Sequence, residues 1–82
     1  MISNSTITPA DAVRHLRTAA RKSQSATAAI AGITQETVSR IERGYGSSLF
    51  ALAAAVRALD GALAVRMADG RYLDLVLEVP RR

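Results

Sequence analysis

The 82-residue sequence contains no cysteine, no tryptophan, one histidine, one lysine and only three aromatic residues. Without cysteine the chain can form no disulfide and no thiolate zinc site, and this absence fits a reducing compartment. The single histidine, His15, provides neither a metal-binding cluster nor a general base within reach of the serines. We therefore expect no metal, no cofactor and no enzymatic activity, and we expect His15 to be a solvated surface residue.

Long apolar runs are also missing. No stretch of about 18 apolar residues occurs, and residues 1–6 lack the positive start and apolar segment of a signal peptide. We therefore expect a cytoplasmic protein with no membrane partner. A chain of this length allows one small domain, and its 49% hydrophobic content, poor in aromatics, predicts an aliphatic, alanine-rich core.

The charged residues are unequally divided between the two signs. Eleven lysines and arginines oppose seven acidic residues, which gives a net charge of +4. Residues 1–46 hold six of these cations and three of the acids, so most of the excess lies in the first part of the chain. Such an excess favours a partner that carries phosphate groups.

Start and stop signals predict four helices after a flexible arm of residues 1–7. Threonine or serine caps precede helices over 9–22, 24–31 and 35–43, and glycines follow the second and third of these. Either Ser47 or Ser48 caps a fourth helix. Its expected buried stripe consists of Leu49, Leu52, Val56 and Leu59.

The hydrophobic period changes after residue 60. Apolar and polar residues alternate over 62–67 and again over 72–79, and an Asp-Gly pair lies between the two segments. Alternation on both sides of such a pair predicts a β-hairpin. We therefore expect residues 8–60 to form the helical domain and residues 61–82 to form a C-terminal hairpin.

Residues 24–41 have the spacing of a helix-turn-helix, two short helices joined around Gly32. If Val38 and Ile41 face inward, Glu36, Arg40 and Arg43 point outward at about 100° per residue, with polar residues at their flanks. Such side chains can read base edges in DNA, and an arginine can pair bidentately with guanine.

This stretch resembles the XRE (Cro/phage-repressor) helix-turn-helix family. The resemblance rests on Ser23-Gln24, Ala28, Ala31-Gly32-Ile33-Thr34 and residues 37–44, and it extends from Val13 to Leu59. It implies a mainly α fold, a four-to-five-helix, lambda-repressor-like DNA-binding domain, whose partner is double-stranded DNA with a palindromic operator. The family ordinarily has a short fifth helix where this chain has the expected hairpin.

The resemblance also assigns roles to residues. It implies a structural ion pair between Arg17 and Glu42, and such a pair is consistent with the inward positions of both residues. The residues implied in base reading are Gln35, Glu36, Thr37, Ser39 and Arg40. The residues implied in phosphate contact are Ser23, Gln24, Thr34 and Arg43.

Several residues need separate comment. A helix-capping role for Glu36 competes with base reading, because phosphate repels a carboxylate in the groove. Thr27 stands where the family has a buried leucine, and Lys22 replaces an apolar residue, so we expect a thinner core there. Of the remaining basic residues, either Arg21 or Lys22 is expected to touch the DNA backbone. Arg81 and Arg82 are expected to be a solvated tail.

The passage from the fourth helix into a strand resembles the HipB-like antitoxins, which are XRE-type repressors that dimerise through a C-terminal strand and bind a toxin. We therefore expect a homodimeric repressor, and a cognate toxin as a further partner. The alternatives are a stand-alone phage-type or host regulator and, from another class, a protein-interaction adaptor. The expected dimer interface consists of Leu63, Val65, Leu73, Leu75 and Leu77.

Overall fold

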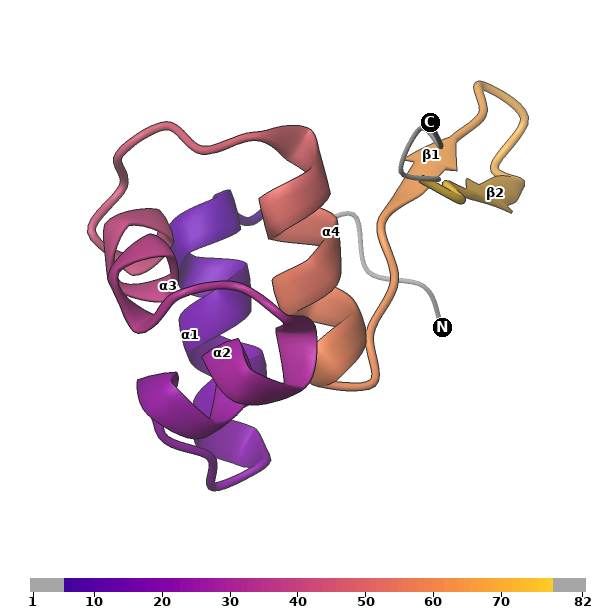
Figure 1. Ribbon diagram of the computed structural model, residues 1–82. Coiled ribbons are helices and arrows are strands. Elements are labelled where there is room, and N and C mark those ends of the chain that lie inside the picture. The colour runs from indigo at the N-terminus through magenta and orange to yellow at the C-terminus, as the bar shows by residue number, and fades with distance from the viewer. Residues whose placement is uncertain (1–5, 78–82) are drawn as a thin grey trace.

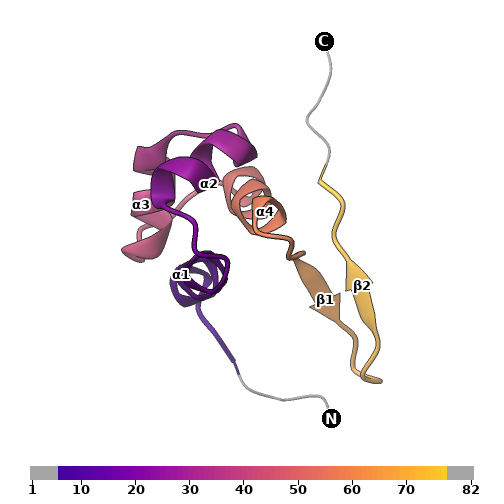
Figure 2. The same ribbon diagram turned by 90° about the horizontal axis from the view of Figure 1, so that it is seen from below.

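The computed structural model describes residues 6–77, which form four helices followed by two short antiparallel strands (Figure 1). The helices form one bundle, and the hairpin stands beside α4 outside that bundle (Figures 1 and 2). The predicted fold class, a mainly α domain with a C-terminal hairpin, is confirmed. The elements are α1 (Pro9–Ala19), α2 (Gln24–Ala31), α3 (Gln35–Glu42), α4 (Leu49–Ala58), β1 (Ala64–Arg66) and β2 (Tyr72–Asp74).

Each helix begins at a hydroxyl cap, as the sequence predicts. The side-chain oxygen accepts a hydrogen bond of 2.9–3.1 Å from the backbone N–H three residues ahead. This bond satisfies one of the amide groups that a helix start leaves without a partner. Of the two serines proposed for α4, the structure selects Ser48. The four caps are Thr8, Ser23, Thr34 and Ser48.

Two helices end earlier than predicted. The prediction for α1 extended to Lys22, but the helix ends at Ala19, because Arg21 adopts a left-handed backbone with φ +57°. The N–H of Lys22 then returns to the carbonyl of Arg17 at 3.1 Å and closes the end of the helix. Similarly, α3 ends at Glu42, one residue before the predicted end, and Gly44 follows with φ +86°.

The core lies between α1, α3 and α4. Its buried members are Val13, Ile41, Ala55, Val56 and Leu59, and the half-buried Leu16, Ile33, Leu52 and Leu63 pack against them. The prediction that Leu49 is buried is wrong, since this residue is 52% exposed. Leu49 occupies the first position of α4, and the buried stripe of that helix begins later, at Leu52 and Ala53.

Thr27 occupies the expected polar position in the core. It is fully buried, and its hydroxyl donates a 2.9 Å hydrogen bond to the carbonyl of Ser23 one turn earlier. This bond satisfies the hydroxyl, which avoids the cost of burying an unpaired polar group. Lys22, the other departure from the family pattern, is half-buried.

The strands of the hairpin are shorter than predicted. β1 and β2 have three residues each, and the central pair is Val65 with Leu73. One further bond, from the N–H of Leu75 to the carbonyl of Leu63 at 2.8 Å, continues the pairing. The predicted strands over 62–67 and 72–79 are thus too long. The Leu63 side chain packs on the helical core while its carbonyl still accepts the bond from Leu75, and residues 78 and 79 lie outside the described residues.

Within residues 6–77, no helix has the length and apolar character that crossing a membrane requires.

Candidate nucleic-acid interface

α2 and α3 are joined by a tight turn that fixes their relative orientation. Gly32 has φ +75°, a left-handed conformation that glycine adopts without steric cost, and the N–H of Ile33 bonds back to Ala28 at 3.1 Å. Ile33 then packs against the core. On α3, Val38 and Ile41 are buried, so the opposite face of this helix is directed away from the bundle.

The five candidates for base reading lie on α3 with different exposure. Gln35, Glu36 and Arg40 are exposed, whereas Thr37 and Ser39 are half-buried. The Thr37 hydroxyl lies 2.8 Å from the Thr34 hydroxyl, so this side chain is held close to the start of its own helix. The outermost groups on α3 are therefore an amide, a carboxylate and a guanidinium, with the hydroxyls at the sides.

Glu36 is paired with the residue that directly follows its own helix. Its carboxylate accepts a hydrogen bond from Arg43 at 3.3 Å, across two turns. Arg43 also directs its Nε towards the carbonyl of Ser39 at 3.4 Å. The Arg43 charge reduces the negative potential that Glu36 would present to phosphate, and this contact differs from the capping role considered for Glu36.

An aromatic ring in the turn after α3 lies close to two arginines. The guanidinium carbons of Arg40 and Arg43 lie 5.4 and 5.2 Å from the centroid of the Tyr45 ring, within the range of cation–π contacts. Tyr45 is 55% exposed. A tyrosine directly after the glycine that ends an arginine-bearing helix is the sequence signal that could have identified this contact.

The candidates for phosphate contact lie mostly at helix starts. Ser23 and Thr34 cap α2 and α3, and Gln24 is the first residue of α2. The free amides and the dipole of a helix start favour an anion at such positions. Gln24 is half-buried, and its Nε2 donates one hydrogen bond to Glu42 at 3.2 Å, which leaves its second N–H for another acceptor.

The ion pair between Arg17 and Glu42 is present and largely buried. Arg17 donates from Nε and Nη2 to the two carboxylate oxygens at 2.6 and 3.0 Å, and the Glu42 side chain is 4% exposed. Arg17 also donates to the carbonyl of Lys22 at 3.0 Å, and Arg14 donates to the backbone carbonyl of Glu42. These contacts join the end of α3 to α1, to the turn after α1 and to the first residue of α2.

The same contacts set the charge state of the pair. Burial by itself would raise the pKa of the Glu42 carboxyl. The hydrogen bonds from Arg17 and Gln24, with the charges of Arg17 and Arg14, outweigh burial, so the pKa of Glu42 lies below its ordinary value. The hydrogen bond to Glu42 correspondingly raises the pKa of Arg17, against the opposing effect of burial. Both groups are therefore charged near neutral pH.

The remaining basic residues and His15 differ in exposure. Arg21 and His15 are exposed, whereas Lys22 is half-buried, so Arg21 is the more accessible of the two candidates for backbone contact. Among residues 6–77, no group of three or more histidines and carboxylates could hold a metal ion.

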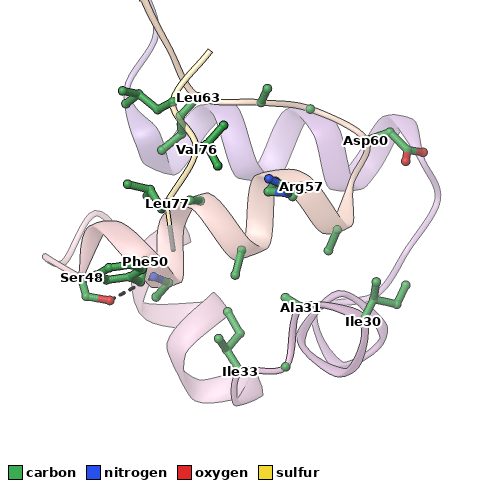
Figure 3. Close-up of a pocket in the computed structure, with 18 of the residues that line it drawn as sticks. Ile30, Ala31, Ile33, Ser48, Phe50, Arg57, Asp60, Leu63, Val76 and Leu77 are labelled. Atoms are coloured by element: carbon green, nitrogen blue, oxygen red, sulfur yellow. Dashed lines mark hydrogen bonds between the residues drawn. The ribbon is translucent and has the colours of Figure 1, made fainter. Parts of the chain in front are cut away.

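The proposed dimer residues differ in their surroundings. Leu63 packs on the core and Leu77 is half-buried, whereas Val65, Leu73 and Leu75 are exposed. Between the hairpin and the helices, an open groove of about 1060 Å³ runs along α4. Figure 3 shows its two sides, with Leu63, Val76 and Leu77 near the hairpin and Ile30 and Ile33 across α4.

Comparison with known proteins identifies the helical part of the chain. The comparison with curated proteins finds no match. A family model described as Helix-turn-helix, HTH_3, matches residues 13–65, which is more than half of the chain and ends within β1. Members of this XRE/Cro-type family are DNA-binding domains of transcriptional regulators and have no enzymatic role. The α2–turn–α3 unit, its exposed polar face and this match together show that the chain belongs to the HTH_3 helix-turn-helix family of DNA-binding proteins.

Proposed function

We propose that the chain is a sequence-specific transcriptional repressor that acts in the cytoplasm and binds a palindromic operator as a dimer. The observation that carries this proposal is the division of α3 into two faces. Val38 and Ile41 anchor one face in the core, and Gln35 and Arg40 are exposed on the other. A helix supported in this way can enter the major groove and present hydrogen-bonding groups to base edges.

The side chains divide into two roles. Arg40 pairs with a guanine, and Gln35, Glu36, Thr37 and Ser39 complete the base-reading surface. Gln24, with Ser23, Thr34 and Arg43, contacts phosphate and sets the position of α3 on the duplex. Contacts to phosphate give affinity without selectivity, whereas contacts to base edges give selectivity.

Replacement of one residue from each set tests this division. We expect Arg40→Ala to relax selectivity at one base pair per half-site by about 1–3 kcal/mol, the usual value of a bidentate base contact. Gln24→Ala should weaken binding to all sequences alike. The measurement is selection from a randomised duplex library, followed by titration of the enriched duplexes with each variant.

Arg57→Ala is the matched control, since it removes an exposed arginine from α4, on the groove beside the hairpin. It should leave both affinity and selectivity close to those of the wild type. If Arg40→Ala kept the wild-type preference across the library, the role of Arg40 would be refuted. If the wild type enriched no sequence at all, the proposal of a sequence-specific repressor would fail.

The hairpin is the proposed dimerisation element. It has two three-residue strands, and the Val65–Leu73 pair exposes 45% and 56% of its two members. A two-stranded hairpin is marginally stable in water by itself, and exposed apolar strands readily pair with another chain. Two joined hairpins would place two α3 helices on one face of DNA, at half-sites about 34 Å apart.

Sedimentation of the wild type and of charged variants tests the dimer. Leu73→Lys or Leu75→Lys should convert the dimer expected at micromolar concentration into a monomer, because each substitution places a charge in the proposed interface. Ala68→Lys, at the exposed hairpin turn, should leave the assembly unchanged. A wild type that sediments as a monomer at micromolar concentration would contradict the proposal, as would intact assembly of the Leu73 and Leu75 variants.

For the biological setting, we propose that the chain is the antitoxin of a toxin–antitoxin pair and represses its own operon. The support is the resemblance to HipB-like antitoxins together with an open groove along α4, of mixed apolar and polar lining, that is separate from the exposed face of α3. The test is affinity purification of the chain with the product of the adjacent gene, both expressed from their native operon. A chain that binds DNA but retains no partner would instead be a stand-alone regulator, and one that shifts no promoter DNA would be an adaptor.

A further inference from the structure

The end of α3 places an aromatic ring beside Arg40. The N–H of Gly44 bonds to the carbonyl of Ile41 at 3.0 Å, and the N–H of Tyr45 bonds to the carbonyl of Arg40 at 3.0 Å. This is the double hydrogen bond of a Schellman motif, which frequently includes an apolar contact between the side chains in the positions of Tyr45 and Arg40. Here the ring and the guanidinium take the place of that apolar contact, with 5.4 Å between the ring centroid and the guanidinium carbon.

The two arginines beside the ring differ in their other partners. Arg43 uses its Nη2 for Glu36 and directs its Nε towards Ser39. Within residues 6–77, the Arg40 guanidinium makes no hydrogen bond and no ion pair. A guanidinium that rests on a ring face keeps the five N–H donors at its edge available.

The Arg40 guanidinium is therefore held by a ring while its N–H donors stay available, and base reading requires both properties. An unsupported arginine must lose rotamer freedom when it pairs with a base, and this loss reduces the gain from the contact. A ring that already restricts the guanidinium lowers this entropic cost and does not use the donors. The Tyr45 backbone is itself fixed by the bond to Arg40, so the support belongs to the same helix end as the residue it supports.

We propose that Tyr45 is a positioning residue for base reading, whose ring holds the Arg40 guanidinium ready to pair with a guanine. This inference rests on the proposed function, because it assigns Tyr45 a part in the selectivity that Arg40 provides. Tyr45 acts through Arg40 and not through a base or phosphate contact of its own. The aromatic ring is the required feature, and the hydroxyl is not.

The experiment compares Tyr45→Phe, which keeps the ring, with Tyr45→Leu, which removes it. For each variant, the dissociation constant is measured for the preferred duplex and for duplexes altered at the base pair that Arg40→Ala relaxes. Tyr45→Phe should keep the wild-type ratio of these constants. Tyr45→Leu should lower the ratio about two- to fivefold per half-site, the effect of losing one cation–π contact at an exposed site.

A double variant separates positioning from a general structural effect. In an Arg40→Ala background, Tyr45→Leu should lower the ratio no further, because the group it positions is gone. Thermal unfolding by circular dichroism verifies that each variant is folded. If the leucine variant does not fold, Tyr45→Met provides a second ring-free side chain with the same expected ratio.

Three results would overturn the inference. The first is uniform weakening by Tyr45→Leu with an unchanged ratio, and the second is an equal loss in Tyr45→Phe, which would assign the effect to the hydroxyl. The third is a further loss of selectivity in the double variant. If the wild type is selective and any of these results is found, only the role of Tyr45 is refuted. If the wild type shows no sequence preference, the proposed function and this inference are refuted together.

Discussion

The Glu42 side chain connects α1, α2 and α3 through its hydrogen bonds and its ion pair. Its carboxylate accepts hydrogen bonds from Arg17 and Gln24 while 4% of the side chain is exposed. A buried charge without partners costs several kcal/mol, so the pair with Arg17 makes the position tolerable rather than adding large net stability. Because Gln24 is one of the proposed phosphate contacts, the same carboxylate links the packing of the helices to the candidate interface.

The pH dependence of stability follows from the lowered pKa of Glu42. Well above about pH 4.3, the ordinary glutamate value, the carboxyl is charged in both the folded and the unfolded chain, and the pair contributes fully. As the pH falls below that value, the unfolded chain takes up the proton first, so the free energy of unfolding decreases until the pH passes the lower pKa of the folded state.

We expect Glu42→Gln to lower the free energy of unfolding by about 1.5–3 kcal/mol at pH 7, the usual range for hydrogen bonds to a charged group. Its loss of stability between pH 5 and 3 should be smaller than that of the wild type, because the titrating group is absent. Urea titrations followed by circular dichroism at each pH measure both effects. Asp69→Asn, at an exposed carboxylate that pairs with Arg71, should change little, and parallel pH curves for Glu42→Gln and the wild type would contradict the assignment.

Several helices end through a left-handed residue. Arg21 after α1 and Asp60 after α4 adopt φ +57° and +65°, and Gly44 after α3 adopts +86°. In each case the following residue bonds back into the helix, so the helix stops and the chain changes direction. Glycine has no steric cost in this conformation, whereas an L side chain does.

The substitution of glycine for arginine should therefore have opposite effects at two positions. Arg21→Gly should raise the free energy of unfolding by about 1 kcal/mol, because it relieves the left-handed backbone. Arg57→Gly should lower it by about 1 kcal/mol, because Arg57 lies inside α4, where glycine is a poor helix former. Urea denaturation of the two variants tests both predictions. Destabilisation by Arg21→Gly would show that the strain at this helix end is negligible.

The hairpin shows how far alternation alone determines strand length. The alternating pattern predicted strands of six and eight residues, but each observed strand has three. All six paired residues are exposed, so neither strand has a second layer that would extend and fix the pairing. A partner chain could supply that layer, and this is a further reason to test the hairpin as a dimer contact.

At the scale of the whole molecule, the charge distribution suits a polyanionic partner. The chain carries a net charge of +4, and the exposed Arg21, Arg40 and Arg43 belong to the half that contains the helix-turn-helix. When basic groups neutralise phosphates, counterions are released from DNA, and the affinity becomes strongly dependent on salt.

With roughly six phosphate contacts in a dimer, the affinity for duplex DNA should fall by about a thousandfold or more between 50 and 200 mM salt. Fluorescence anisotropy titrations over that range measure the slope. Arg43→Gln should reduce the slope by about one contact per chain if Arg43 contacts phosphate, whereas Arg57→Gln should leave it unchanged. An equal slope for Arg43→Gln and the wild type would remove Arg43 from the phosphate set.

The sequence by itself determined the four helices, the caps of the first three, the helix-turn-helix and the inward position of Val38 and Ile41. These features depend on local chemistry, namely hydroxyl caps, glycine ends and the helical period, which is readable along the chain. The pairing of Arg17 with Glu42 was also expected, although family resemblance suggested it. Sequence reasoning did not determine where α1 ends, because nothing in the local pattern forces Arg21 into a left-handed backbone.

Only the tertiary structure decided the contacts that join separate segments. It placed Gln24 on Glu42, left Leu49 exposed, and brought Tyr45 beside Arg40 and Arg43. It also placed Leu63 on the helical core and left the paired residues of both strands exposed. The physical reason is that periodicity fixes which face of an element is apolar, whereas the partner of each side chain depends on how the packed elements meet.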